Sequence, residues 1–379
     1  MHLNRGLKQK ISILYADTGG GHRSSGEAIS QGIEIAYPGQ FEVSFVNNFR
    51  SWPFPFSIAE DIYPPLVNHA RPVYKATFRA TNHKNVTATL RRMFEPLSEK
   101  LAAEMLAQYP ADLYLSVHPL YNQVLPAAIR ETKARAKYVS VVTDLVTGHV
   151  QWYHQDVHRC IVPTSAAFEQ AVHFGIPRDH VRIGGQPVWP DFAKRMTAGA
   201  QTRAALGLDP NIPVALLMGG GDGMGRLEGL ARNIAWSGLP LQLIVVCGRN
   251  VAVMQALEFV RPRIPAMRVL GFVRNVPELM GASDVLITKA GPGTICEGFV
   301  AGLPIILYDA IPGQEEGNIA LVEEQGAGVY CKSTRSVLRQ LEHWLGNKEA
   351  FHTAKISSSQ LARPDAAVEI ARLSIEMLA

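Results

Sequence analysis

The chain has 379 residues, of which 47% are apolar and 18% are charged. These proportions are ordinary for a soluble globular protein, and the length predicts two domains. The net charge of +4 is too small to indicate a nucleic-acid-binding protein, and four widely spaced cysteines predict neither a disulfide framework nor a zinc cluster.

The first predicted strand, residues 11–16, leads into the glycine-rich stretch DTGGGHRSSGE at 17–27. Glycines let a backbone approach a bound molecule closely, which makes Gly20 and Gly21 candidate ligand contacts. His22 follows at the mouth of the turn. Because the pKa of histidine lies near neutral pH, His22 is a candidate general base, with Asp17 as a rival. The alternative is that His22 only caps its helix or holds a phosphate.

Residues 49–95 mix aromatic side chains with cations, and their prolines predict that the segment begins as a loop. Aromatic rings can lie at a bilayer interface while cations attract anionic lipids, so Trp52, Phe54 and Phe56 are candidate membrane contacts. Single-stranded nucleic acid would also bind aromatics among cations. A core helix with an ordinary solvated face is the plainer alternative.

The other strands predicted in the first half are residues 41–46, 112–117, 137–142 and 160–164. Asp144 follows the third of these and is a second rival to His22, or a partner that orients it. Further on, His154 and His158 are spaced to face one metal if they lie on a helix. A metal hydrolase is nevertheless disfavoured, because Gln155 stands where the H-E-x-x-H motif needs glutamate.

In the second half, strands are predicted at 214–218, 241–246, 267–272, 284–288 and 304–309. Apolar runs that alternate with helical patterns predict an α/β fold with two Rossmann-like domains. The Gly/Pro-rich segment at residues 184–190 predicts a hinge. We therefore expect domains at 1–186 and 187–362 that face an inter-domain cleft, with a last helix at about 363–379 packing back on the first domain.

Three loops of the second half carry polar or glycine-rich motifs. Gly220 and Gly221 follow a strand and precede a helix, where backbone N–H groups can bind phosphate, although the loop matches neither a Walker loop nor G-x-G-x-x-G. Gly293 and Thr294 form a second such turn, and Glu297 can accept both hydroxyls of a ribose or simply cap the helix. The third loop offers side chains for sugar hydroxyls: Gln314, Glu315 and Asn318.

The stretch GFVRNVPELMGASDVLITKAGPGTICEG, followed by GLPIILYDAIPGQEEGN, closely resembles the monogalactosyldiacylglycerol synthases and the bacterial diacylglycerol glucosyltransferases. These are GT-B enzymes related to the GlcNAc transferase of peptidoglycan synthesis. DTGGGHRSSGEAI and VTDLVTGHVQWYH resemble the same family, so the resemblance covers nearly the whole chain. It implies a UDP-sugar donor in the second domain and a lipid acceptor in the first.

The resemblance also implies roles for single residues. It puts the catalytic base at His22 and the ribose at Glu297. The remaining roles are uracil at Phe272 and Val273, diphosphate at Gly221, Arg249, Gly293 and Thr294, sugar at Gln314 and Glu315, and acceptor at His149 and Trp152.

The resulting prediction is an inverting glycosyltransferase that moves a hexose from a UDP-sugar to diacylglycerol and forms a β-glycosyldiacylglycerol. Galactose is the preferred choice of hexose. No D-x-D pair occurs, which favours catalysis without a bound metal or other cofactor. Without a signal-peptide pattern or an apolar run of spanning length, we expect a cytoplasmic enzyme on the surface of an anionic membrane. Nucleic acid is not expected as a partner.

Several alternatives stay open. The alternative donors are UDP-glucose, with single or processive transfer to diacylglycerol, and UDP-GlcNAc, because all of them use the same donor loops. A non-catalytic sensor of nucleotide sugar or lipid is a remoter alternative. The base among His22, Asp144 and Asp17, lipid activators and the oligomeric state are not decided by the sequence.

Overall fold

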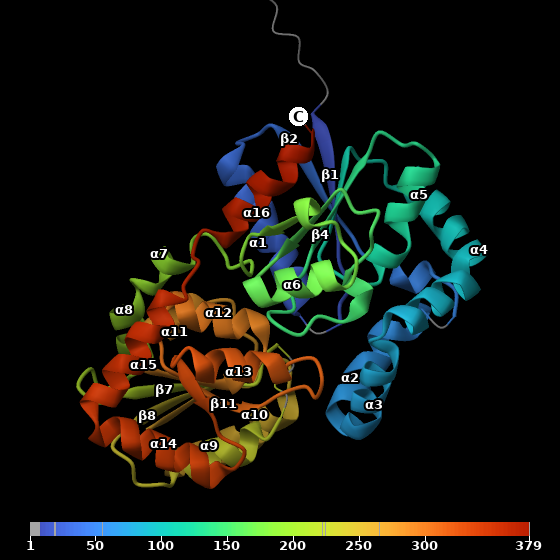
Figure 1. Ribbon diagram of the computed structural model, residues 1–379. Helices are drawn as coiled ribbons and strands as arrows, with labels where there is room; N and C mark the ends of the chain where they lie inside the picture. Colours follow the sequence, from blue (N-terminus) through green and yellow to red (C-terminus); the bar gives the residue numbers. More distant parts are fainter. Residues whose placement is uncertain are drawn as a thin grey trace, which may run out of the picture. The chain divides into compact units, whose positions relative to one another are not determined.

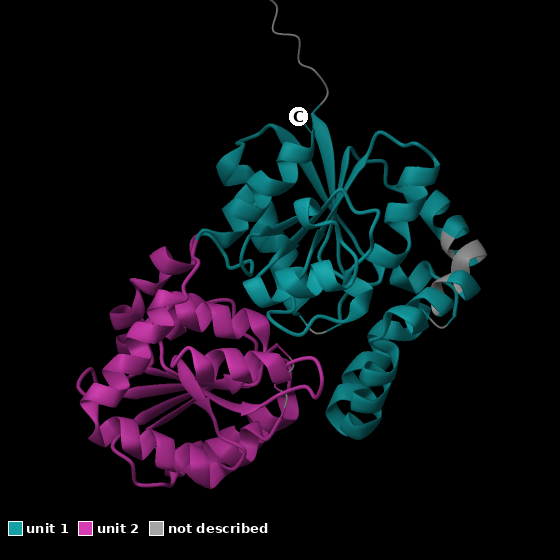
Figure 2. Ribbon diagram, in the orientation of Figure 1, with its two compact units in different colours: residues 1–190, 365–379 teal, residues 191–364 magenta. Residues whose placement is uncertain are grey.

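The computed structural model describes residues 8–18, 20–54, 56–221, 223, 225–264 and 266–378. It divides into two compact units, one formed by Met1–Pro190 with Asp365–Ala379 and the other by Asp191–Pro364 (Figure 2). The first boundary follows the Gly/Pro-rich segment, and the chain returns to the first unit for its last helix. Each unit has a parallel sheet of its own.

Unit 1, which contains both chain ends, has a six-stranded sheet in the order β2-β1-β3-β4-β5-β6 (Figure 1). Its central strands are buried, and the two faces pack into separate apolar clusters. Strands covered on both faces are recognisable in a sequence as short continuous apolar runs. The strands are β1 Gln9–Leu14, β2 Phe41–Val46, β3 Leu113–Ser116, β4 Lys137–Val141, β5 Arg159–Val162 and β6 Val181–Ile183.

The helices of unit 1 are α1 Gly21–Ala36, α2 Ala59–His69, α3 Arg71–Thr81, α4 Lys84–Gln108, α5 Leu125–Glu131, α6 Ser165–His173 and α16 Ala366–Ile375. The last helix packs on α1 (Figure 1), where Gly32 allows close contact: a Cβ on this residue would lie 2.4 Å from the carbonyl oxygen of Ala367. Arg159 of β5 donates to Glu376 Oε2 at 2.6 Å, just beyond α16. The chain end is thereby fastened to the sheet of unit 1.

Unit 2 also has a six-stranded sheet, in the order β12-β11-β10-β7-β8-β9. The strands are β7 Val214–Met218, β8 Gln242–Val246, β9 Met267–Leu270, β10 Val285–Lys289, β11 Ile305–Asp309 and β12 Gly328–Tyr330. The helices are α7 Phe192–Met196, α8 Gly199–Ala205, α9 Leu227–Ala235, α10 Val251–Val260, α11 Val276–Gly281, α12 Pro292–Val300, α13 Glu316–Glu324, α14 Thr334–Gly346 and α15 Lys348–Gln360.

Both sheets have a point where the chain reverses its direction of travel across the sheet. In unit 1 the chain passes from β1 to β2 on one side and from β3 to β4 on the other. In unit 2 it passes from β7 to β8 on one side and from β10 to β11 on the other. Loops diverge at such points and leave a crevice at the carboxyl ends of the strands, where open α/β sheets bind ligands. The two crevices lie beside the β1–β3 and β7–β10 pairs.

Candidate active site

His22 is the second residue of α1 and lies at the crevice of unit 1. Its Nδ1 is 2.7 Å from the carbonyl oxygen of Val117, just after β3, and 3.2 Å from Thr143 Oγ1, just after β4. Because a carbonyl oxygen can only accept, Nδ1 carries the proton of the neutral ring. The lone pair of the imidazole is therefore on Nε2, which is the arrangement that a general base needs.

A second histidine, which the sequence analysis missed, lies against the first. The rings of His22 and His118 meet edge to face with centroids 4.8 Å apart, and His118 is almost fully buried. Burial lowers the pKa of His22 to about 4, and burial together with the nearby His22 lowers the pKa of His118 well below its usual value. Both rings are neutral at pH 7. His118 directly follows the predicted strand 112–117, a position that the strand-end rule would have singled out.

The two acidic rivals of His22 have other partners. Asp144 is buried, and its Oδ2 accepts from the indole Nε1 of Trp152 at 2.6 Å. Asp17 is exposed, and its backbone N–H donates to Glu60 Oε1 at 2.6 Å. The ring centroids of Trp152 and His22 are 6.0 Å apart. The indole of Trp152 therefore lies beside His22 and is hydrogen-bonded to Asp144. Of the three candidate bases, His22 is the one whose hydrogen bonds place an imidazole lone pair on Nε2, and which of them acts as the base stays a prediction.

The aromatic residues predicted to touch a membrane separate into buried and exposed ones. Trp52 is 3% exposed, packs on Phe49 and Tyr121 at centroid distances of 4.6 and 5.5 Å, and donates its indole N–H to Asn48. Its ring is therefore part of the core and does not reach the surface, which corrects the prediction. Phe56 is half-buried, whereas Phe54 is 76% exposed.

His149 connects the loop after β4 to helix α3. Its Nδ1 accepts from the backbone N–H of Gln151, so Nε2 carries the proton and donates to Thr81 Oγ1 at 3.0 Å. Burial lowers its pKa to about 4, and its ring packs on Phe78 at 5.0 Å. Trp152 is buried and His149 is half-buried, and both side chains are hydrogen-bonded within unit 1. Their contact with an acceptor stays a prediction.

The histidine pair at 154–158 does not have the geometry of the metal-site alternative. These residues form a turn and not a helix. His158 Nδ1 accepts from the backbone N–H of Tyr138 at 3.1 Å. In the part of the chain that the structure describes, no group of three histidine, cysteine or acidic side chains is placed to hold a metal ion.

In unit 2 the loops after β7, β8 and β9 contact one another. Gly220 has a φ of +73°, a conformation that favours glycine. Asp222, two residues further along the loop, lies outside the described residues. The backbone N–H of Arg249 donates to the carbonyl of Gly221 at 2.9 Å, and its guanidinium lies 4.9 Å from the ring centroid of Phe272. That ring is 54% exposed, and Val273 beside it is half-buried. Of the predicted uracil and diphosphate residues, Gly221, Arg249 and Phe272 are thus brought together.

The loop after β10 contains the predicted ribose residue. Gly293 and Thr294 form the first turn of α12, and Glu297 follows one turn later. Glu297 is half-buried, and burial raises the pKa of its carboxyl to about 7. A carboxyl group with such a pKa gains its charge readily when hydroxyl donors approach it.

In the loop after β11, two of the three predicted sugar-binding side chains are buried and hydrogen-bonded to neighbouring residues. Glu315 is 3% exposed and accepts from Lys289 Nζ at 2.6 Å and from the backbone N–H of Ile311 at 2.9 Å. Asn318 is also buried and donates to the carbonyl of Ala290. Gln314 is half-buried. Lys289, which ends the apolar run of β10, is a further residue that the sequence analysis missed.

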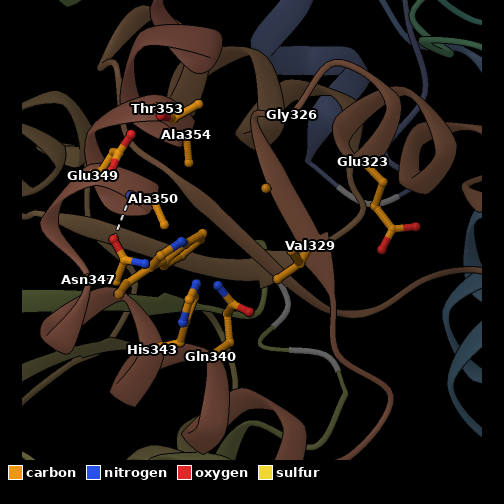
Figure 3. Close-up of a pocket in the computed structure, with 12 residues that line it drawn as sticks. Glu323, Gly326, Val329, Gln340, His343, Asn347, Glu349, Ala350, Thr353 and Ala354 are labelled. Carbon is orange, nitrogen blue, oxygen red and sulfur yellow. Dashed lines mark hydrogen bonds between the residues drawn. The ribbon is translucent and has the colours of Figure 1, made fainter.

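A hollow of about 570 Å³ opens elsewhere on unit 2, near the start of β12 and the junction of α14 and α15 (Figure 3). Gln340, His343 and Trp344 line one side, while Asn347 caps α15 at Ala350. Because α14 runs back from the carboxyl end of β12, this hollow lies at the amino ends of the strands, away from the crevice beside β7 and β10. It contains none of the predicted site residues.

Comparison with known proteins relates both units to sugar-transferring enzymes. Residues 22–188 match the monogalactosyldiacylglycerol (MGDG) synthase family, and residues 215–370 match the glycosyltransferase family 28 C-terminal domain. The monogalactosyldiacylglycerol synthase of Spinacia oleracea chloroplasts is 38% identical over 375 residues, which span 96% of this chain and 71% of that protein.

Solved structures show the fold. Acinetobacter baumannii MurG superposes with a TM-score of 0.61 at 15% identity, over 97% of this chain and 99% of that one. Anabaena HepE, solved in complex with UDP and glucose, superposes with a TM-score of 0.57 at 14% identity, over 97% and 99% of the two chains. Two Rossmann-like sheets with these neighbours show a GT-B fold. Of the helices described, none is both long and apolar enough to cross a membrane.

Proposed function

Because the chain belongs to the monogalactosyldiacylglycerol synthase family, we propose that it transfers galactose from UDP-galactose to the free hydroxyl of diacylglycerol. The enzyme is a UDP-sugar-dependent glycosyltransferase. The choice of galactose and diacylglycerol is supported by the name of the Spinacia oleracea relative. The product of an inverting transfer would be a β-galactosyldiacylglycerol.

The observation that carries this proposal is the tautomer of His22. Val117 holds the Nδ1–H, and the lone pair on Nε2 is available to take the proton of the acceptor hydroxyl. The acceptor oxygen attacks C1 of the hexose, and the bond from C1 to the β-phosphate oxygen breaks with its electron pair staying on UDP. The imidazole is held in place by Thr143 and by the ring of His118. The ring of Trp152, which is hydrogen-bonded to Asp144, packs beside it.

The loops of unit 2 supply the donor subsites in this proposal. Uracil would lie beside Phe272, with Arg249 stacked on the same ring, and the diphosphate would meet the glycine loops after β7 and β10. The ribose hydroxyls would donate to Glu297, whose pKa burial raises to about 7 and whose charged form such donors would favour. Gln314, which is half-buried in the loop after β11, would meet the hexose.

We place the enzyme on the membrane surface, since diacylglycerol is a bilayer lipid. Helices α2 and α3 pack on each other and stand out from the sheet of unit 1 (Figure 1). With the preceding loop they expose apolar side chains: Phe54 is 76%, Val73 58% and Ile62 47% exposed. Exposed apolar side chains beside the cations of α3 match the chemistry of an anionic bilayer interface.

The deciding experiment is turnover on diacylglycerol in anionic liposomes, with UDP-galactose, UDP-glucose and UDP-GlcNAc offered separately and with EDTA present. A galactolipid formed from UDP-galactose, with the other donors at least tenfold slower, is the expected result. Faster transfer from UDP-glucose would move the enzyme to the diacylglycerol glucosyltransferases. Absence of a glycolipid from all three donors, in a chain that binds UDP, would refute the diacylglycerol assignment.

A further inference from the structure

Lys289 lies at the crevice of unit 2, as the last residue of β10. Its side chain is 17% exposed, and Nζ donates to Glu315 Oε1 at 2.6 Å. Glu315 is more deeply buried, and the backbone N–H of Ile311 holds its second oxygen. The ion pair therefore belongs to the interior of the loop cluster and is not a contact formed at the surface.

The ammonium group of Lys289 has more N–H donors than the described protein groups provide acceptors for. An ammonium carries three N–H groups, and among the residues that the structure describes Glu315 is the sole acceptor bonded to Nζ. A largely buried charge with unused donors is unfavourable unless something else accepts from it. A ligand with several acceptor oxygens would complete this site.

Two glycines keep the space beside the ammonium open. A Cβ on Gly291 would lie 2.9 Å from Lys289 Nζ, and one on Gly220 would lie 3.2 Å from Cε. The two glycines belong to the loops after β10 and β7, which are neighbouring strands. The lysine thus stands between the two glycine loops, and a ligand that entered the crevice would meet it there.

The start of α12 adds positive potential at the same place. The helix begins at Pro292, directly after Gly291, with no side-chain cap and no acidic residue in its first turn. Its first N–H groups carry the partial positive charge of the helix dipole. An anion between the loops would therefore meet an ammonium group and a helix amino terminus together, and a diphosphate has the charge and the oxygens for both.

We propose that Lys289, held in position by Glu315, donates to the diphosphate of the sugar donor and stabilises the negative charge on the departing UDP. This inference rests on the proposed function, and it gives Glu315 a positioning role in place of the predicted contact with the sugar. As the bond from C1 to the β-phosphate oxygen breaks, the electron pair stays on that oxygen and the acceptor proton goes to His22. The ammonium keeps its own protons and acts through its charge.

The test compares the binding of UDP and of uridine to variants of the full chain by calorimetry. Lys289→Met alone would leave a buried carboxylate without its cation, so the informative variant is Lys289→Met/Glu315→Gln, measured against Glu315→Gln alone. We expect the double variant to bind UDP about tenfold or more weakly than Glu315→Gln, because a charge-assisted hydrogen bond to phosphate is lost. Uridine, which has no phosphate, should bind both variants equally.

Matched measurements separate the charge of Lys289 from general effects. Lys355→Met, at an exposed lysine of α15, removes one positive charge far from the crevice and should leave UDP affinity unchanged. Lys289→Arg keeps the charge and should retain more UDP affinity than Lys289→Met. Glu315→Gln should lower kcat more than it changes the KM for the donor, because a misplaced ammonium still attracts the diphosphate but meets the leaving oxygen poorly.

Three results would overturn the inference. Equal UDP affinity in the double variant and in Glu315→Gln, with equal melting temperatures, would show that the lysine does not reach the diphosphate. An equal loss of UDP and uridine binding would indicate a distorted loop. A wild-type chain that binds no UDP would refute the proposed function itself, and this inference with it.

Discussion

At the scale of single residues, the proposed chemistry depends on Nε2 of His22. We predict that His22→Ala lowers kcat by about a hundredfold to ten-thousandfold, the usual contribution of a proton-transfer group. Binding of UDP should not change, because in the proposed mechanism the histidine takes the acceptor proton and the loops of unit 2 hold the nucleotide. Steady-state kinetics and calorimetry on the same preparation check both statements.

His352→Ala is the matched control, since this histidine is exposed on α15. Its turnover should equal that of the wild type. If His22→Ala retained more than a tenth of the wild-type kcat, the base would have to be sought elsewhere, first at Asp144.

Glu297 leads to a prediction about pH. Its pKa of about 7 in the free chain lies above the usual value, so the carboxyl is mostly protonated at pH 6 and mostly charged at pH 8. Ribose hydroxyls that donate to it favour the charged form, so ligand binding releases a proton and affinity rises with pH. We expect uridine to bind up to about tenfold more tightly at pH 8 than at pH 6.

Calorimetry with uridine checks this, because uridine has no phosphate whose own titration would interfere. Glu297→Gln cannot titrate at this position, and its uridine affinity should not vary between pH 6 and pH 8. A wild-type affinity that was constant over this range would show that the ribose does not meet Glu297.

At the scale of elements, the contact of α1 with α16 depends on Gly32. A methyl group here would meet the backbone oxygen of Ala367 at 2.4 Å, so the helices must separate to admit it. We predict that Gly32→Ala lowers the free energy of unfolding by about 1–3 kcal/mol, the usual effect of overpacking. Gly229→Ala, in α9 with open space around it, should instead raise stability by up to about 1 kcal/mol. Urea denaturation distinguishes the two, and equal effects would contradict the close helix contact.

The loop before α2 gives a second prediction at this scale, since it places one aromatic ring inside and another outside. Phe54→Ser should weaken liposome binding severalfold with no change in melting temperature, because its ring is exposed. Trp52→Ala should cost about 3–5 kcal/mol of stability, because its ring is buried against Phe49. Vesicle flotation and thermal melts measure the two effects. A lower melting temperature in Phe54→Ser, or an unchanged one in Trp52→Ala, would contradict the assignment of an exposed and a buried ring.

At the scale of the whole molecule, association with a membrane should depend on charge. The net charge of +4 is modest, but α3 gathers Arg71, Lys75 and Arg79 beside exposed apolar side chains. We predict that binding to vesicles with anionic lipid weakens markedly between 50 and 500 mM salt, roughly as the Debye length shortens from above 10 Å to below 5 Å. Neutral vesicles should bind weakly at every salt concentration, and salt-independent binding would point to apolar insertion alone.

The two units are built alike: the side chains to which we assign a function follow or end neighbouring strands, at the point where the chain reverses direction across the sheet. In unit 1, His22 follows β1 and His118 follows β3; in unit 2, the glycine loop follows β7 and Lys289 ends β10. Much of this was predictable, because parallel strands are continuous apolar runs and glycine loops follow them. All ten runs expected as strands are strands. Among the described residues, the two strands that were not predicted are β6 and β12. Both are three-residue edge strands, which are too short to carry a periodic signal.

The amino-acid sequence by itself determined the α/β class, the paired sheets, the positions of the glycine loops and the family, because these depend on local apolar runs and on motifs of neighbouring residues. Only the tertiary structure decided which side chains meet. His22 touches Val117 and Thr143 because β1, β3 and β4 are neighbours, and Glu315 is bound to Lys289 because β10 and β11 are neighbours. Strand order brings together residues distant in the chain, and burial then sets which polar groups remain available, a balance that no local pattern encodes.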